Sequence, residues 1–129
     1  MKVAVAVITD QQQRLLIAQR PQHAPHAGMW EFPGGKVERD ELPEAALIRE
    51  IKEEVGLDVI HYDFLGEINH AYDHQQVSLI VYHVSDFAGE ASCCEAQMDL
   101  RWVEFASLQN FDFPAANDQI IELIRQKIL

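Results

Sequence analysis

Hydrophobic positions alternate with small or polar ones in several short runs of the chain. In residues 2–9, valine recurs at every second position, which is the spacing of a strand that presents one face to a core. Polar residues at 10–13 indicate a turn, so residues 15–19 are expected to complete a hairpin with the first strand. Runs of the same kind predict further strands over residues 58–65, 67–72, 77–84 and 100–105, with a turn at 73–76.

Two segments carry the spacing of a helix instead. Residues 43–55 place Ala46, Leu47 and Ile51 on one face, and residues 118–129 repeat isoleucine and leucine at three- and four-residue intervals. Strands interleaved with two helices indicate an α/β fold in which a mixed β-sheet lies between helices.

The first predicted helix has an acidic face. Glu50, Glu53 and Glu54 lie three and four residues apart, so their carboxylates point the same way and repel one another. They also lie near the end of the helix before Gly56, where the helix dipole disfavours anions. A bound divalent cation would reverse both penalties. The alternative is an ordinary solvated acidic helix.

Composition narrows the classes of function. The formal net charge of −11 argues against general affinity for nucleic acid or anionic membrane, and no apolar run approaches the ~20 residues that span a bilayer. A nucleotide is also an anion, so binding one would require local cations. The adjacent Cys93 and Cys94 are unsuited to a mutual disulfide and predict free thiols in a reducing cytoplasm. We expect one domain over residues 1–129.

Residues 35–57, GKVERDELPEAALIREIKEEVGL, match the pattern G-x5-E-x7-R-E-U-x-E-E-x-G-U at every position, where U is apolar. The segment therefore resembles the Nudix box. The matching residues are Gly35, Glu41, Arg49, Glu50, Ile51, Glu53, Glu54, Gly56 and Leu57. This resemblance implies the α/β/α sandwich of the Nudix hydrolases and a metal-dependent nucleoside triphosphate pyrophosphohydrolase.

The resemblance also implies roles for the box residues. Mg²⁺, or Mn²⁺, would be bound by one backbone carbonyl and three carboxylates, those of Gly34, Glu50, Glu53 and Glu54. The metal would neutralise the triphosphate and make a bound water more acidic. Glu53, or else Glu50, would act as the general base. Arg49 would fix a glutamate by a bidentate contact, unless it forms only an exposed salt bridge to Glu53 or Glu54.

Two other glutamates could belong to the same site. Glu41, at the start of the box helix, is expected to stabilise the first turn or hold the adjoining loop rather than to bind metal. In relatives, a loop glutamate in the region of Glu95 can approach the metal. The alternative for Glu95 is a solvated loop residue.

Beyond the box, the chain resembles the MutT branch of the family, the 8-oxo-dGTP diphosphatases. The resemblance rests on LLIAQRP and GMWEFPGGK before the box and on FPAAN at residues 113–117. It implies hydrolysis of 8-oxo-dGTP to 8-oxo-dGMP and pyrophosphate, which cleanses the nucleotide pool and avoids mutation. The nucleotide would then be contacted by Arg20, Glu31, Phe32, Pro33, Gly34 and Asn117. An exposed charge for Arg20 and core packing for Phe32 are the alternatives.

The amide of Asn117 offers a donor beside an acceptor. Guanine oxidised at C8 presents the O6 acceptor next to an N7–H donor, which complements that pair, whereas ordinary guanine has a bare N7. A site of this kind can reject the analogue that lacks the proton by roughly 10⁴-fold. The alternative is that Asn117 only caps the last helix.

Two other functions remain open. One is a pyrophosphohydrolase of CTP or another nucleoside triphosphate, because MWEF and GGKVE also occur in such relatives. The other is a non-catalytic nucleotide-sensing Nudix domain, which agrees less well with a complete set of box carboxylates. The expected partner is a small-molecule nucleoside triphosphate, without direct nucleic-acid or membrane binding. We expect a monomer, with a dimer as the alternative.

Overall fold

The computed structural model describes residues 1–72 and 74–129 and, within them, two β-sheets and two α-helices. In chain order the elements are β1 (Lys2–Ile8), β2 (Leu15–Gln19), β3 (Trp30–Glu31), β4 (Gly34–Lys36), α1 (Pro43–Val55), β5 (Asp58–Tyr72), β6 (Gln75–Ala88), β7 (Asp99–Val103), the 3₁₀ helix η1 (Phe105–Asn110) and α2 (Asn117–Lys127). No helix in the described part of the chain is both long and apolar enough to cross a membrane.

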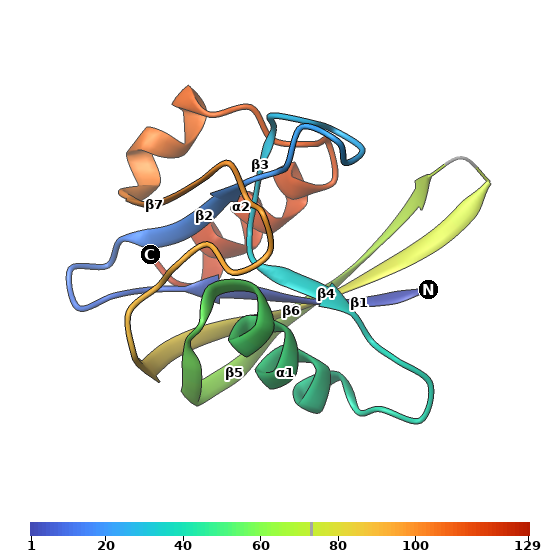
Figure 1. Ribbon diagram of the computed structural model, residues 1–129, viewed down its shortest axis with the longest axis horizontal. Helices are drawn as coiled ribbons and strands as arrows, with labels where there is room; N and C mark the ends of the chain where they lie inside the picture. The colour runs from blue at the N-terminus through green and yellow to red at the C-terminus, as the bar shows by residue number, and fades with distance from the viewer. Residues whose placement is uncertain (73) are drawn as a thin grey trace.

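The larger sheet has the strand order β4-β1-β6-β5. It is mixed, because β1 pairs with β6 in parallel and the other pairs are antiparallel. The smaller sheet has the order β3-β2-β7 and is antiparallel. Helices α1 and α2 pack in two different core clusters and flank the larger sheet (Figure 1). The predicted α/β/α arrangement with a mixed sheet is confirmed.

Strand β1 is buried on both faces. Val5 and Val7 belong to the core cluster that contains the apolar side of α2, whereas Ala4 and Ala6 belong to the cluster that contains α1. Small side chains on the second face allow α1 to pack close to the sheet. This packing brings the acidic face of α1 beside the neighbouring strand β4.

The predicted hairpin of residues 2–9 and 15–19 is wrong. Strands β1 and β2 lie in different sheets and are joined only by the isolated bridge between Thr9 and Leu15. Both edges of β1 are already paired, one with β4 and the other with β6. Alternation along a strand shows which face is buried but not which strand pairs with it, so the pattern predicted the strands without their partners.

Other predicted boundaries also change. Residues 58–65 and 67–72 form a single strand, β5, in which the register shifts between Phe64 and Gly66. Of the turn predicted at 73–76, His74 lies in a turn and the last two residues already belong to β6, while Asp73 lies outside the described residues.

Helix α1 has the buried face that its sequence predicts, because Ala46, Leu47 and Ile51 are fully buried. Pro43 is its first residue, and Gly56 ends it in the left-handed region, at a φ of 75°, where glycine is favoured.

The glycines before the helix form the edge strand β4 rather than a plain loop. A Cβ atom on Gly34 would lie 2.2 Å from the carbonyl oxygen of Ala4, so the close pairing of β4 with β1 requires glycine there.

Candidate functional site

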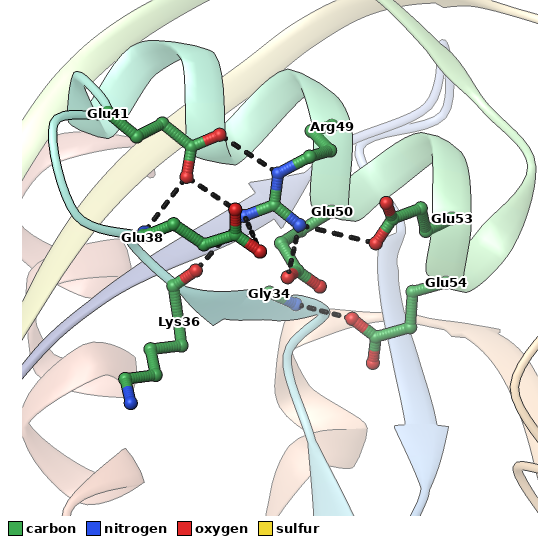
Figure 2. Close-up of polar contacts among 8 residues, drawn as sticks. All are labelled: Gly34, Lys36, Glu38, Glu41, Arg49, Glu50, Glu53 and Glu54. Atoms are coloured by element: carbon green, nitrogen blue, oxygen red, sulfur yellow. Dashed lines mark hydrogen bonds and ion pairs between the residues drawn. The ribbon is translucent and has the colours of Figure 1, made fainter.

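Arg49 is the centre of a polar network on α1 (Figure 2). Its guanidinium donates two hydrogen bonds to Glu41, both at 2.9 Å. It also donates to Glu50 at 2.8 Å, to Glu53 at 3.2 Å and to the carbonyl of Lys36 at 3.1 Å. These five bonds use every N–H of the guanidinium. Arg49 therefore forms both contacts that the sequence left open, a bidentate pair and salt bridges along the helix.

Glu41 links this network to the loop before α1. The hydrogen bonds from Arg49, followed by one from the backbone N–H of Glu38 at 3.0 Å, lower the pKa of Glu41 to about 2. Its carboxylate is occupied on both oxygens. These contacts agree with the structural role expected for Glu41 and leave metal binding to other carboxylates.

Glu54 is a buried carboxylate without a cationic partner among the described residues. Its side chain turns away from Arg49 and accepts a hydrogen bond from the N–H of Gly34 at 2.9 Å (Figure 2). Burial, aided by the nearby carboxylates of Glu31, Glu50 and Glu95, raises the pKa of Glu54 to about 8, although the Gly34 bond acts to lower it. An ionised carboxylate in this position lacks the charge compensation that buried anions need.

Four acidic residues line one cavity of about 350 Å³, and one of them is Glu31. Glu50, Glu54 and Glu95 line it together with Gly34 and Gly35. Burial raises the pKa of Glu50 despite its pairing with Arg49, and Glu53 and Glu95 also raise it. Glu95 is exposed and also lines this cavity, so the structure places a solvated loop carboxylate beside the cluster.

The donor set suits a hard divalent cation. Mg²⁺ and Mn²⁺ prefer oxygen ligands. The cavity is also lined by Arg20 and Lys36, but Arg20 is paired with Glu31, and the buried carboxylate of Glu54 has no cationic partner among the described residues. In the described residues no three acidic, histidine or cysteine side chains already form a complete metal cluster, because Glu50 is turned to Arg49 and Glu54 to Gly34. Binding would require those carboxylates to exchange partners for the cation.

Glu53 is not brought into this cavity. Its side chain is about half exposed, at 49%, and its carboxylate pairs with Arg49. The participation of Glu53 as a ligand or base, and of the Gly34 carbonyl as a ligand, stay predictions.

Sequence reasoning missed Gln97, which is 8% exposed and lies in the loop between β6 and β7. Its amide nitrogen donates to the carbonyl of Glu54 at 2.8 Å, and its amide oxygen accepts from the N–H of Glu95 at 2.9 Å. In the sequence it is one polar residue in a polar loop, so nothing in the local pattern distinguishes it.

A second cavity, of about 490 Å³, adjoins the first and is mainly apolar. It is lined by Met1, Val3, Val5, Arg20, Pro25, His26, Glu31, Phe32, Gly34, Gln75, Val77, Leu79, Pro114, Asn117 and Ile120. Of the residues expected to contact a nucleotide, Pro33 is absent from this lining. It is buried between β3 and β4, and its carbonyl accepts the N–H of Ala6 in β1 at 2.8 Å.

Arg20, Glu31 and Gly34 line both cavities. Arg20 donates to Glu31 at 2.6 Å and to the carbonyl of Pro25 at 2.7 Å. The same guanidinium therefore joins Glu31 to the loop between β2 and β3, whose Pro25 lines the apolar cavity. Burial raises the pKa of Glu31, and Arg20 opposes that effect. One elongated ligand could therefore lie in both cavities and pass over this pair.

Asn117 lies at the apolar cavity as the first residue of α2. The cap position belongs to Ala116, and no side chain caps this helix, so the alternative that Asn117 serves only as a cap is wrong. Its amide nitrogen makes a long bond of 3.3 Å to the carbonyl of Pro114. Phe32, which also lines the cavity, is 4% exposed and stacks on Phe113 with ring centres 5.4 Å apart, so it combines core packing with cavity lining.

The chain is similar to known proteins over almost its whole length. A family model described as the NUDIX domain matches residues 4–123. The chain is 31% identical over 126 residues to an 8-oxo-dGTP diphosphatase of Escherichia coli strain K12, covering 98% of this chain and 97% of that protein.

Two further relatives bear on the substrate and the fold. The chain is 38% identical over 93 residues to a CTP pyrophosphohydrolase of the same strain, covering 72% of this chain and 69% of that protein. A solved structure from a study of MutT from Aliivibrio salmonicida and Vibrio cholerae has a TM-score of 0.84 and 34% identity, covering 98% of this chain and 99% of that one.

Proposed function

Because this chain belongs to the Nudix family, we propose that it is a metal-dependent nucleoside triphosphate pyrophosphohydrolase that prefers 8-oxo-dGTP. Water would attack phosphorus within the triphosphate and release 8-oxo-dGMP and pyrophosphate, so the cellular role would be to cleanse the nucleotide pool. The observation that carries the proposal is the junction of the two cavities. The apolar cavity with Asn117 suits a base, and the carboxylate cavity suits a triphosphate with its cation.

Different residues of α1 would bind the cation, accept the proton of the attacking water and orient the base. Bound Mg²⁺ or Mn²⁺ supplies positive charge for the triphosphate and acidifies a coordinated water. Glu50 and Glu54 would hold the cation, with Glu95 from the opposite loop, and Glu53 is the further candidate ligand. Glu53 or Glu50 would accept the proton of the attacking water. Arg49 would orient both candidate bases, since it donates to each of them.

At the other end of the substrate, Phe32 and the neighbouring valines would surround the base, and Asn117 would pair with it. The Arg20–Glu31 bridge would lie between the base and the phosphates. The proposed setting is a cytoplasmic monomer that does not bind nucleic acid directly, supported by two exposed free thiols at Cys93 and Cys94 and by the net charge of −11.

Turnover of a nucleotide panel tests the proposal. We expect Mg²⁺-dependent release of pyrophosphate from 8-oxo-dGTP with kcat/KM higher than for dGTP by roughly 10²-fold or more, because ordinary guanine lacks the N7 proton that the amide oxygen needs. Product analysis should give a nucleoside monophosphate. Equal rates for 8-oxo-dGTP and dGTP would remove the claim of specificity while leaving the hydrolase claim intact.

The second candidate is a CTP pyrophosphohydrolase, which the 38% identity to a protein of that name favours. The same panel separates the two, since this candidate requires CTP to be the best substrate. A non-catalytic nucleotide-sensing domain would instead bind nucleotide without turnover at any Mg²⁺ or Mn²⁺ concentration.

We expect Gly35→Ala to displace the carboxylate of Glu50. A Cβ atom on Gly35 would lie 2.2 Å from the carboxyl carbon of Glu50, and that flexible side chain can move where backbone could not. A misplaced catalytic group should lower kcat by about 10- to 100-fold, while the melting temperature changes by only a few degrees. Steady-state kinetics and thermal denaturation check this. Unchanged kcat would show that the position of Glu50 is not important for turnover.

A further inference from the structure

Gln97 uses both ends of its amide to join two acidic residues of the site. The amide nitrogen is bonded to the carbonyl of Glu54, and the amide oxygen to the N–H of Glu95. The side chain of Gln97 is 8% exposed, so its amide is largely shielded from water and needs both partners to remain satisfied. Gln97 therefore couples the last turn of α1 directly to the backbone that carries Glu95.

The surrounding loop is docked on the same end of the helix. The N–H of Cys94 donates to the carbonyl of Glu54 at 3.1 Å, and the N–H of Ser92 donates to the carbonyl of Val55 at 2.9 Å. The last carbonyls of a helix have no partner within it, so the loop satisfies them. On its other side the loop is fixed to β2, where Met98 donates to the carbonyl of Gln19 at 3.0 Å.

The backbone between Glu95 and Gln97 has a conformation that surrounding contacts must stabilise. Ala96, between Glu95 and Gln97, has a φ of 60°, which is unfavourable for a residue with a Cβ atom and is kept only where surrounding contacts impose it. The carboxylate of Glu95 is also repelled by those of Glu50 and Glu54, which line the same cavity. This repulsion likewise disfavours the observed position of Glu95. Without the bond to Gln97, both effects would move the exposed Glu95 carboxylate away from Glu50 and Glu54.

We propose that Gln97 is a positioning residue that holds Glu95 at the carboxylate cavity and thereby strengthens divalent-cation binding. The inference rests on the proposed function, because it requires a cation in that cavity. Gln97 also lines the cavity, but both ends of its amide are bonded to backbone groups of Glu54 and Glu95 rather than left for a ligand. Its effect would pass through the backbone of Glu95.

Mn²⁺ binding in the absence of substrate tests the proposal. Electron paramagnetic resonance of free Mn²⁺ would give the dissociation constant for the wild type, Gln97→Met, Glu95→Gln and the double variant. Methionine has nearly the size of glutamine but cannot form either bond. We expect each single change to weaken Mn²⁺ binding about tenfold, as is typical when support around a metal ligand is lost. The double variant should be no weaker than Glu95→Gln alone, because Gln97 acts through Glu95.

The other outcomes are distinguishable. An unchanged dissociation constant in Gln97→Met, or a further tenfold loss in the double variant, overturns the proposal. If the wild type binds no Mn²⁺, the proposed function fails as well.

Two other variants distinguish loss of the Gln97 bonds from a general loss of folded structure. Gln97→Asn retains an amide that is too short to form both bonds, and it replaces the methionine variant if that protein does not fold. It is expected to weaken binding likewise. Ala96→Gly relieves the left-handed backbone while keeping Gln97 and should bind Mn²⁺ as the wild type does.

Discussion

Replacing Glu54 by glutamine is expected to abolish most of the activity while making the metal-free protein more stable. The variant keeps an oxygen that can accept the N–H of Gly34, but it removes a negative charge from a cavity already lined by Glu50 and Glu95. Loss of a group that stabilises charge in the transition state lowers kcat by about a thousandfold. The same loss relieves the penalty of burying an anion.

The gain in stability should depend on pH in a defined direction. The pKa of Glu54 is about 8 in the folded, metal-free protein, against 4.5 for an ordinary glutamate. Between these values the folded state holds a proton that the unfolded state has lost. The contribution of Glu54 to the free energy of unfolding is therefore complete below pH 4.5 and decreases as the pH rises towards 8. At pH 8 the variant should be more stable by on the order of 3 kcal/mol.

Urea denaturation in EDTA between pH 5 and pH 8 measures this effect as the difference between variant and wild type. Glu53→Gln is the matched control, because Glu53 is on the same helix but 49% exposed, and its stability should follow the wild type. A Glu54→Gln protein that is less stable than the wild type at pH 8 would show that the buried carboxylate is compensated in some other way.

Replacing Asn117 by alanine should remove the preference for oxidised guanine. Alanine cannot pair with O6 and N7–H, so kcat/KM for 8-oxo-dGTP should fall by about 10²- to 10⁴-fold. The value for dGTP should change only a few-fold, because that base pairs poorly with the amide to begin with. Steady-state kinetics with both nucleotides, and with CTP, give the comparison.

Asn117→Asp is the informative partner variant. It retains an oxygen for the N7 proton but loses the donor for O6, so its rate with 8-oxo-dGTP should also be low. Both variants should keep the wild-type melting temperature within a few degrees, since no side-chain cap of α2 is lost. Equal losses for 8-oxo-dGTP and dGTP would mean that Asn117 supports the cavity without distinguishing the bases.

Local periodicity predicted the elements of this fold better than their pairing. The buried residues Ala46, Leu47 and Ile51 follow from helical spacing alone. In contrast, the parallel partner of β1 is β6, which is far along the chain, so that Lys2 lies beside Ser78. A short alternating run contains no information about a partner that distant.

In the candidate site, too, the residues of one helix were predictable from the sequence, whereas the contacts between distant segments were not. Glu50 and Glu54 are prominent because their spacing places unfavourable charge on one face of a helix. Gln97 is not prominent in the sequence, because its contacts arise only when it is buried against the last turn of α1, which is far away in the chain. Glu95 was suggested only by resemblance, and its place at the cavity depends on that same loop.

The pairing of Lys2 with Ser78 has a consequence for the order in which the protein assembles. During synthesis α1 leaves the ribosome before β6, so β1 cannot complete the larger sheet until most of the chain is available, and closing so long a loop is slow. Until then the acidic face of α1 is hydrated and ionised. At neutral pH, completing the metal-free fold therefore draws a proton from the surrounding water onto Glu54.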